Sequence, residues 1–132
     1  MDAHVNANIS MEQNVLDIFN RHLAAFFAGD LDAVLKDFGT DSVVITQEGV
    51  FEGPQQIRKV FQGLLTEFGV IDQGDSPGFT FTMIQPCHNT LFIVWNAISK
   101  HHVFPFGTDT FVCHGDKIKR QTFAFSSPEK RL

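Results

Sequence analysis

The chain has no tyrosine, a single tryptophan and only two cysteines among its 132 residues, and 19% of the residues are charged. The cysteines, Cys87 and Cys113, form no C-x-x-C motif, and two thiols supply no disulfide framework. A chain of this length buries roughly two-thirds of its unfolded surface without covalent cross-links. We therefore expect a single domain with reduced thiols, as is typical of cytoplasmic proteins.

Two further absences exclude classes of partner. No segment approaches the roughly 18 consecutive apolar residues of a membrane span, and residues 1–8 have neither the basic nor the apolar region of a signal peptide. Lysine and arginine are not clustered, and the net charge of −5 repels the phosphate groups of nucleic acid and of anionic lipid. The sequence predicts a protein that binds neither nucleic acid nor membranes.

Phenylalanine, by contrast, is abundant. Its 15 side chains bury large apolar areas and bring no hydroxyl group that needs a hydrogen bond. So many rings in a small domain indicate that some line a cavity or a subunit interface in addition to filling a core. We expect a small hydrophobic ligand as a partner.

Helical and strand patterns occur in two successive blocks. Apolar residues recur at helical spacing over residues 12–28, 31–38 and 54–68, with Asp30 placed to cap the second helix and Pro54 to begin the third. Strand-like runs cover residues 42–47, 50–51, 79–85, 91–99, 103–113 and 117–125, with a loop at 73–78. Helices followed by antiparallel strands predict one α+β domain over residues 11–127, between tails at 1–10 and 128–132.

Three segments resemble one superfamily: residues 21–32 (RHLAAFFAGDLD), residues 51–53 (FEG), and residues 107–112 (GTDTFV) with Lys117-Ile118. In this order they are similar to the nuclear transport factor two, ketosteroid isomerase and SnoaL-like proteins. The resemblance implies a cystatin-like, cone-shaped α+β barrel, with three N-terminal helices packed in a strongly curved antiparallel sheet. It also implies a homodimer through the sheets, for which aromatic surface is available at Phe79, Phe81, Phe104 and Phe106.

Proteins of this superfamily have diverse functions, so the function of this chain has to be inferred from individual residues. The resemblance places His22 at the position of the tyrosine of ketosteroid isomerase, Asp109 at that of its protonated aspartate, and Thr46 at that of its aspartate base. A threonine hydroxyl does not abstract a proton from carbon. The sequence therefore argues against the standard isomerase reaction.

His22 and Asp109 are the candidate catalytic residues. His22 falls on the apolar stripe of the first helix, beside Phe26, so it points inward. Asp109 alternates within a strand with Gly107 and Phe111, among apolar neighbours, where burial raises its pKa and a cationic His22 would lower it. Either side chain also has a purely structural interpretation, as a buried group bonded to its neighbours.

Further residues are candidates for contact with a substrate: Thr46, Gln121, Trp95, Phe111, Phe123 and Phe26. Thr46 and Gln121 supply uncharged hydrogen-bonding groups on strands, and Trp95 either lines the cavity or fills the core. The adjacent His101 and His102 face opposite ways on a strand and have no acidic partner at ligand spacing, so we expect no metal. No cofactor is expected either.

Two hypotheses follow. The first is a cofactor-independent enzyme of the isomerase, lyase (dehydratase) or cyclase type, acting on a hydrophobic carbonyl compound with Asp109 and His22 in proton transfer. The second is a non-catalytic ligand-binding or dimerisation module, which the excess of phenylalanine and the missing base at Thr46 favour.

Overall fold

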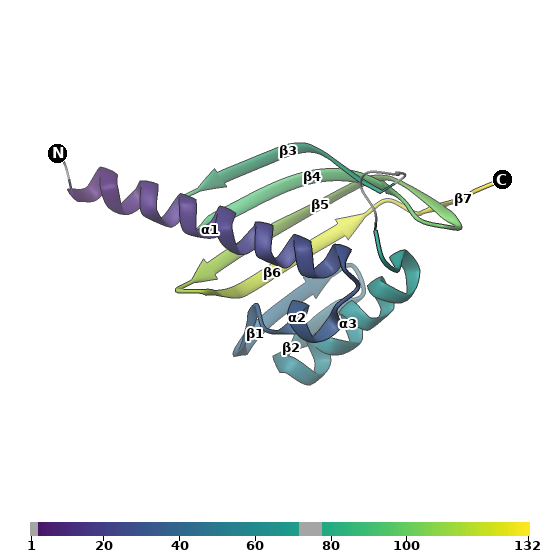
Figure 1. Ribbon diagram of the computed structural model, residues 1–132, viewed down its shortest axis with the longest axis horizontal. Coiled ribbons are helices and arrows are strands. Elements are labelled where there is room, and N and C mark those ends of the chain that lie inside the picture. The colour runs from purple at the N-terminus through teal and green to yellow at the C-terminus, as the bar shows by residue number, and fades with distance from the viewer. Residues whose placement is uncertain (1–2, 72–77) are drawn as a thin grey trace.

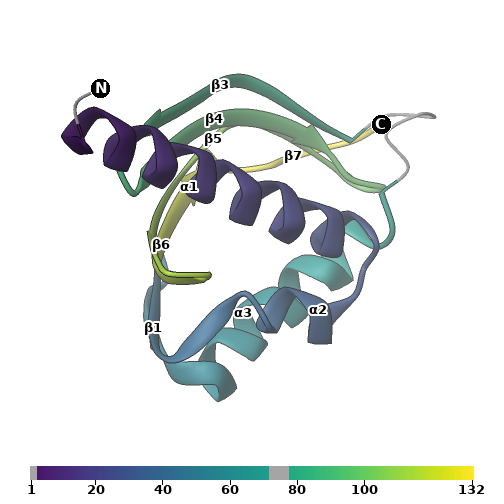
Figure 2. The same ribbon diagram turned by 60° about the vertical axis from the view of Figure 1, so that its left-hand side comes forward.

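The computed structural model describes residues 3–71 and 78–132, with side chains from residue 10 onward. Three helices, α1 (Ala3–Phe27), α2 (Leu31–Leu35) and α3 (Gly53–Phe68), pack against one face of a curved sheet (Figure 1). The sheet bends around the helices without closing into a complete barrel (Figure 2). This arrangement confirms the cone-shaped α+β architecture expected from the sequence. The predicted loop at 73–78 lies almost wholly outside the described residues.

The sheet has the strand order β2-β1-β6-β5-β4-β3, with β7 paired to β5. The strands are β1 (Phe38–Thr46), β2 (Gly49–Glu52), β3 (Phe79–Cys87), β4 (Thr90–Ile98), β5 (His102–His114), β6 (Lys117–Phe125) and β7 (Glu129–Lys130). Strands β3 to β6 form the predicted antiparallel series, because short turns join them. However, β1 lies parallel to β6, so the sheet is mixed where the sequence indicates antiparallel pairing throughout.

The helix ends follow the capping residues in the sequence. The carboxylate of Asp30 accepts a hydrogen bond from the amide of Ala33 (3.1 Å) at the start of α2. Helix α3 has Pro54 in its first turn and ends before Gly69, whose φ of 63° suits glycine. Both chain ends differ from expectation. Helix α1 already begins at Ala3, within the tail predicted at residues 1–10, and β7 lies within the tail predicted at residues 128–132. Among the described residues no helix has the length and hydropathy to cross a membrane.

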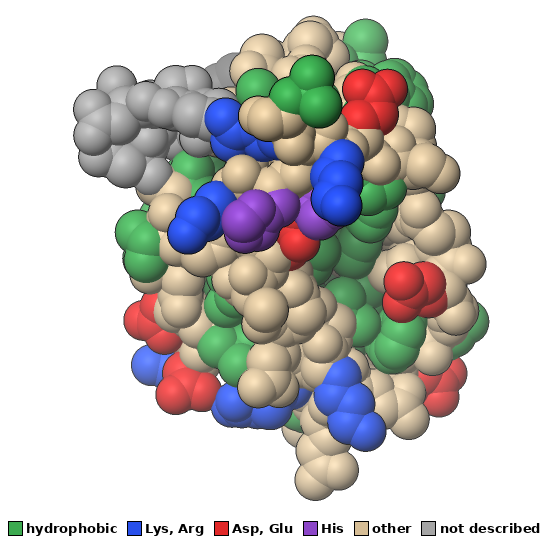
Figure 3. Space-filling model, turned by 90° about the vertical axis from the view of Figure 1, so that its right-hand side faces the viewer, with side chains coloured by type: hydrophobic (Ala, Val, Ile, Leu, Met, Phe, Trp, Pro, Cys, Tyr) green, Lys and Arg blue, Asp and Glu red, His purple; other side chains and the backbone are tan. Residues whose placement is uncertain are grey.

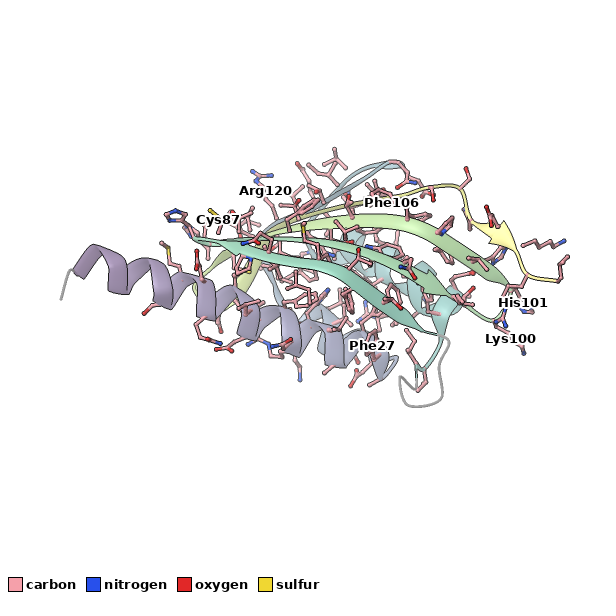
Figure 4. All side chains as sticks on the ribbon, turned by 90° about the horizontal axis from the view of Figure 1, so that it is seen from above. Phe27, Cys87, Lys100, His101, Phe106 and Arg120 are labelled. Atoms are coloured by element: carbon pink, nitrogen blue, oxygen red, sulfur yellow. The ribbon has the colours of Figure 1, made fainter. Side chains whose placement is uncertain are left out.

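The two faces of the sheet differ in what covers them. The concave face packs against α1, whose buried residues include Val15, Phe19, His22 and Phe26, as the sequence predicts. Of the four phenylalanines that offer aromatic surface for a dimer, Phe79, Phe81 and Phe104 line the cavity on this concave face. Phe106 is 54% exposed and lies on the side of the sheet that faces away from α1 (Figure 4).

Candidate functional site

An apolar cavity lies between the concave face of the sheet and helices α1 and α3. Its volume is about 70 Å³. Because one water molecule needs roughly 10–15 Å³ of such space, the cavity has room for a few waters or a small organic group. Most of the lining is aromatic. The residues predicted to contact a substrate line it, with the exception of Thr46: His22, Phe26, Trp95, Asp109, Phe111, Gln121 and Phe123.

Asp109 lies on β5 and is hydrogen-bonded to both neighbouring strands. Its Oδ1 accepts a hydrogen bond from Nε1 of Trp95 on β4 (2.8 Å), and its Oδ2 accepts one from Nε2 of Gln121 on β6 (2.9 Å). In the sheet register Trp95 lies opposite Gly107, and Gln121 lies opposite Phe111. Both partners therefore reach Asp109 diagonally on the same face. Two neutral donors fix the orientation of the carboxylate.

Gly107 makes the contact between Trp95 and Asp109 possible. A Cβ atom at this position would lie 2.3 Å from the Trp95 ring, well inside van der Waals contact. The indole therefore lies directly against the glycine backbone, and from there its Nε1 reaches Asp109. The sequence does not decide whether Trp95 lines a cavity or fills the core. Its side chain does both, because it is buried and lines the cavity.

Burial dominates the electrostatics of Asp109. Loss of hydration raises the pKa of this carboxyl from 3.8 to about 6, and the hydrogen bonds from Gln121 and Trp95 limit the rise. In the described part of the chain no lysine or arginine lines the cavity. Asp109 is therefore a carboxyl group that exchanges its proton closer to neutral pH than an ordinary surface carboxyl does.

Gln121 presents an unsatisfied oxygen. Its Nε2 is bonded to Asp109, whereas its Oε1 is buried and has no hydrogen-bond partner among the described residues. A buried acceptor left unpaired costs about 1–3 kcal/mol. Among the described residues this oxygen therefore has an unused capacity to accept a hydrogen bond.

His22 is paired with a carboxylate other than Asp109. Its Nδ1 lies 3.1 Å from Oδ2 of Asp37, a buried residue directly before β1, and Nε of Arg21 donates to Oδ1 of the same carboxylate (2.7 Å). The imidazole also makes edge-on contacts with the rings of Phe38, Phe61 and Phe111. An imidazole held through Nδ1 directs Nε2 away from that partner, and His22 lines the cavity.

Asp37 is a candidate that the sequence pattern does not reveal. Burial raises its pKa, but the hydrogen bonds and charges of His22 and Arg21 outweigh burial and hold the pKa below its ordinary value. Asp37 therefore stays ionised near neutral pH and orients His22, as a carboxylate orients the histidine of a catalytic triad. His22 and Asp109 have separate partners within the described residues, so they are not a hydrogen-bonded pair.

Thr46 lines a second cavity, of about 340 Å³, beside the β1–β2 turn and α3. Its Oγ1 accepts a hydrogen bond from the amide of Glu48 (3.0 Å), which is a contact within the turn. Leu64, Phe123 and Phe125 line both cavities, so the cavity at Thr46 (the outer cavity) adjoins the cavity at Asp109 (the inner cavity). Thr46 therefore faces the outer cavity, and not the cavity that holds Asp109.

A separate polar cluster lies where α3 meets the β4–β5 turn. Oε1 of Glu67 accepts hydrogen bonds from Nδ1 of His102 and from Oγ of Ser99 (2.7 Å each), and Arg131 donates to the Ser99 carbonyl (2.7 Å). Figure 3 shows basic and histidine side chains gathered around an acidic one at this end. His102 thus has an acidic partner that is 35 residues away in the sequence. No group of three or more His, Cys, Asp or Glu in the described segments is arranged to hold a metal.

No family model matches the sequence, and no curated protein matches it either. Solved structures are similar in fold. An NTF-2-like protein of unknown function from Burkholderia xenovorans LB400 has 20% identity and a TM-score of 0.67 over 92% of this chain and 89% of that one. The chain has the NTF2-like (nuclear transport factor two-like) fold. This confirms the fold that the resemblance implies.

Other structures that are similar to this chain differ from one another in activity or bound ligand. An LEH-like epoxide hydrolase from M. tuberculosis has 13% identity and a TM-score of 0.67 over 87% of this chain and 84% of that one. A hypothetical protein with a ketosteroid isomerase-like fold from Catenulispora acidiphila DSM 44928, in complex with trimethylamine, has 16% identity and a TM-score of 0.63 over 83% and 85%. The NTF2-like fold therefore does not select a reaction.

Proposed function

We propose that the chain is a cofactor-independent enzyme that moves a proton on a small hydrophobic carbonyl compound, in a reaction of the isomerase, lyase or cyclase type. One observation carries the proposal: a single apolar cavity is lined by Asp109, whose pKa is raised to about 6, and by His22, which Asp37 holds in place. A carboxylate tuned toward neutral pH is suited to act as a general base.

In this reaction Asp109 takes the proton from the carbon next to the carbonyl group. The electron pair of the C–H bond forms the C=C bond of an enol, and the carbonyl oxygen takes a proton from Nε2 of protonated His22, with Asp37 as its counter-ion. Where a further C=C bond of the substrate is conjugated with the enol, return of the proton from Asp109 to the far end of that bond, and of the oxygen-bound proton to His22, completes an isomerisation. No oxidant or reductant is consumed.

Trp95, Gln121 and Asp37 are positioning residues in this scheme. Trp95 and Gln121 hold the two oxygens of Asp109, and Asp37 holds Nδ1 of His22. Groups fixed before the substrate arrives need no reorganisation during proton transfer. The aromatic lining keeps bulk water away from both groups.

Exchange of carbon-bound hydrogen for deuterium tests the proposal without knowledge of the product. Small hydrophobic ketones and aldehydes are incubated with the protein in D₂O, and loss of the α-proton signal is followed by NMR. We expect the protein to accelerate exchange of at least one compound. In Asp109→Asn the exchange rate should fall by about 10²–10⁴-fold. Absence of acceleration across the panel contradicts the proposal.

Two variants separate chemistry from folding. His22→Asn keeps an N–H group for Asp37 and removes Nε2, so exchange should fall while Tm stays close to that of the wild type. Asp32→Asn alters an exposed carboxylate that pairs with Arg58, and neither residue lines the inner cavity, so exchange should be unchanged. If Asp109→Asn fails to fold and no variant catalyses exchange, Asp109 has a structural role instead.

A second candidate function is non-catalytic binding of a small amine. Two observations favour it: ionised Asp109 faces aromatic rings that suit a cation, and the similar Catenulispora acidiphila protein is in complex with trimethylamine. Trimethylammonium should then change the fluorescence of Trp95 saturably, with lower affinity in Asp109→Asn and no exchange on carbonyl probes. A response that does not saturate excludes this candidate.

We also propose that two copies pair through the outer face of the sheet. Phe106 is 54% exposed and Phe92 is 38% exposed. The register also places one row of side chains across β1, β6, β5 and β4, which consists of Ile45, Thr122, Thr110 and Phe92. Uncharged and apolar side chains on a sheet face suit packing against a second copy.

A further inference from the structure

Gln121 leaves one strong acceptor without a partner in the wall of the inner cavity. An ionised carboxylate only accepts hydrogen bonds, so the amide must turn its N–H₂ end to Oδ2 of Asp109, at 2.9 Å. Oε1 is the other end of the same planar group, and it is buried without a partner in the described chain. The orphan oxygen therefore lies beside Asp109.

The protein's own donors in this cavity have other partners in the proposed function, in which Nε2 of His22 protonates the carbonyl oxygen. Nε1 of Trp95 donates to Asp109, and Nδ1 of His22 is bonded to Asp37. The rest of the lining is phenylalanine, leucine and isoleucine. A donor for Oε1 of Gln121 therefore has to arrive with the ligand, attached to an apolar body that fits the aromatic walls.

We infer that the ligand is a small, hydrophobic α-hydroxy carbonyl compound whose hydroxyl group donates to Oε1 of Gln121. The inference rests on the proposed function, in which Asp109 is a base. A protonated amine beside Asp109 would lower the basicity of the carboxylate, whereas a neutral hydroxyl does not. Because Asp109 and Gln121 form one hydrogen-bonded unit, the hydroxyl-bearing carbon is placed at the carboxylate, where it gives up its proton.

Three matched probes of a size that suits the cavity test this assignment: hydroxyacetone, methoxyacetone and acetone. They share the methyl ketone group, and only the first has a hydroxyl donor. Trp95 is the only tryptophan of the chain and is bonded to Asp109, so its fluorescence reports binding. We expect the hydroxyketone to bind about tenfold more tightly than either of the others, because only it satisfies the orphan oxygen.

Two glutamine variants provide the control. Gln121→Met removes Oε1 at similar side-chain volume and should abolish the hydroxyl preference. Gln47 bonds to the backbone of Phe125 beside the outer cavity, so Gln47→Met should retain the preference. Retention of the preference in Gln121→Met overturns the inference.

The remaining outcomes distinguish this inference from the proposed function. Equal binding of the three probes, no binding of the hydroxyketone, or tighter binding of isopropylammonium overturns the inference. If acetone then still exchanges its α-protons, the proposed function stands alone. A hydroxyl preference without exchange on any probe supports the assignment of Gln121 and contradicts the proposed catalysis.

Discussion

Asp37 binds Nδ1 of His22 over 3.1 Å, although it lies in the link between α2 and β1 and outside the lining of the inner cavity. Arg21, the residue before His22, binds the other oxygen of the same carboxylate. One turn of α1 thus supplies both partners of a buried charge. It follows that a change at Asp37 acts on the cavity through the orientation of His22.

Asp37→Asn should lower the free energy of unfolding by about 1–3 kcal/mol, because a buried charge-assisted hydrogen bond is lost. It should also reduce proton exchange through misorientation of His22. Urea denaturation measures the stability, and His22→Phe, which removes the Nδ1 donor, completes a double-mutant cycle. The double variant should lose less than the sum of the single losses, since both changes break one contact. Strict additivity would show that the two residues act independently.

Gly107→Ala should destabilise the fold by about 1–3 kcal/mol, because the new methyl group displaces the Trp95 ring in a packed interior. Displacement also breaks the hydrogen bond from Trp95 to Asp109. The measurement combines thermal unfolding with the emission maximum of Trp95. Gly63 has open space at its Cβ position and lies in a helix, so Gly63→Ala is the control and should not destabilise. An unchanged Trp95 spectrum in Gly107→Ala contradicts the packing argument.

The sequence predicts the elements whose pattern is local. Phe61 lies on the regular apolar face of α3, and Asp109 alternates with Gly107 and Phe111 along β5, so periodicity alone places these side chains inside. His22 is found the same way, from its position on the stripe of α1. Residues that belong to a complete helix or strand pattern therefore reach the cavity as predicted.

Residues whose environment depends on distant pairing are not predictable in this way. Phe38 is expected on the second helix but begins β1, and the amide of Ile118 donates to the carbonyl of Asp37 (2.7 Å) from the other end of the chain. That parallel pairing buries Asp37, and no local pattern encodes it. Thr46 alternates correctly along β1, yet it is the last residue of that strand and contacts the turn.

The stability of the protein should depend on pH through Asp109. Its folded pKa of about 6 lies above 3.8, so the folded state binds the proton more tightly than the unfolded state. The stabilisation is full below about pH 4 and is lost as the pH rises through 6. Relative to Asp109→Asn, the wild type should lose on the order of 2–3 kcal/mol between pH 4 and 7. Asp37 acts in the opposite direction and below this range, because its pKa is lowered.

Denaturation of both proteins at several pH values measures this difference. Contributions from other groups cancel in the comparison, because both proteins contain them. A difference in unfolding free energy that stays constant from pH 4 to 7 contradicts the raised pKa of Asp109.

Pairing through the outer face of the sheet predicts a concentration-dependent dimer. Phe106→Asp places a charge on this face and should shift sedimentation toward the monomer, while Tm changes little because the side chain is exposed. Val70→Asp, at a position that is 75% exposed and follows α3, is the control and should not alter sedimentation. A wild type that sediments as a monomer at micromolar concentration contradicts the dimer.

The fluorescence of Trp95 should titrate with Asp109. Nε1 of Trp95 donates to Oδ1 of Asp109 over 2.8 Å, and protonation of the carboxyl weakens this charge-assisted hydrogen bond. We expect the emission of the folded protein to change with a midpoint near the pKa of about 6. Asp109→Asn should show no such transition, and Asp32→Asn, which leaves the cavity intact, should retain it. A fluorescence transition that persists in Asp109→Asn would assign the midpoint to another group. The absence of a transition in the wild type would show that Asp109 does not titrate beside Trp95.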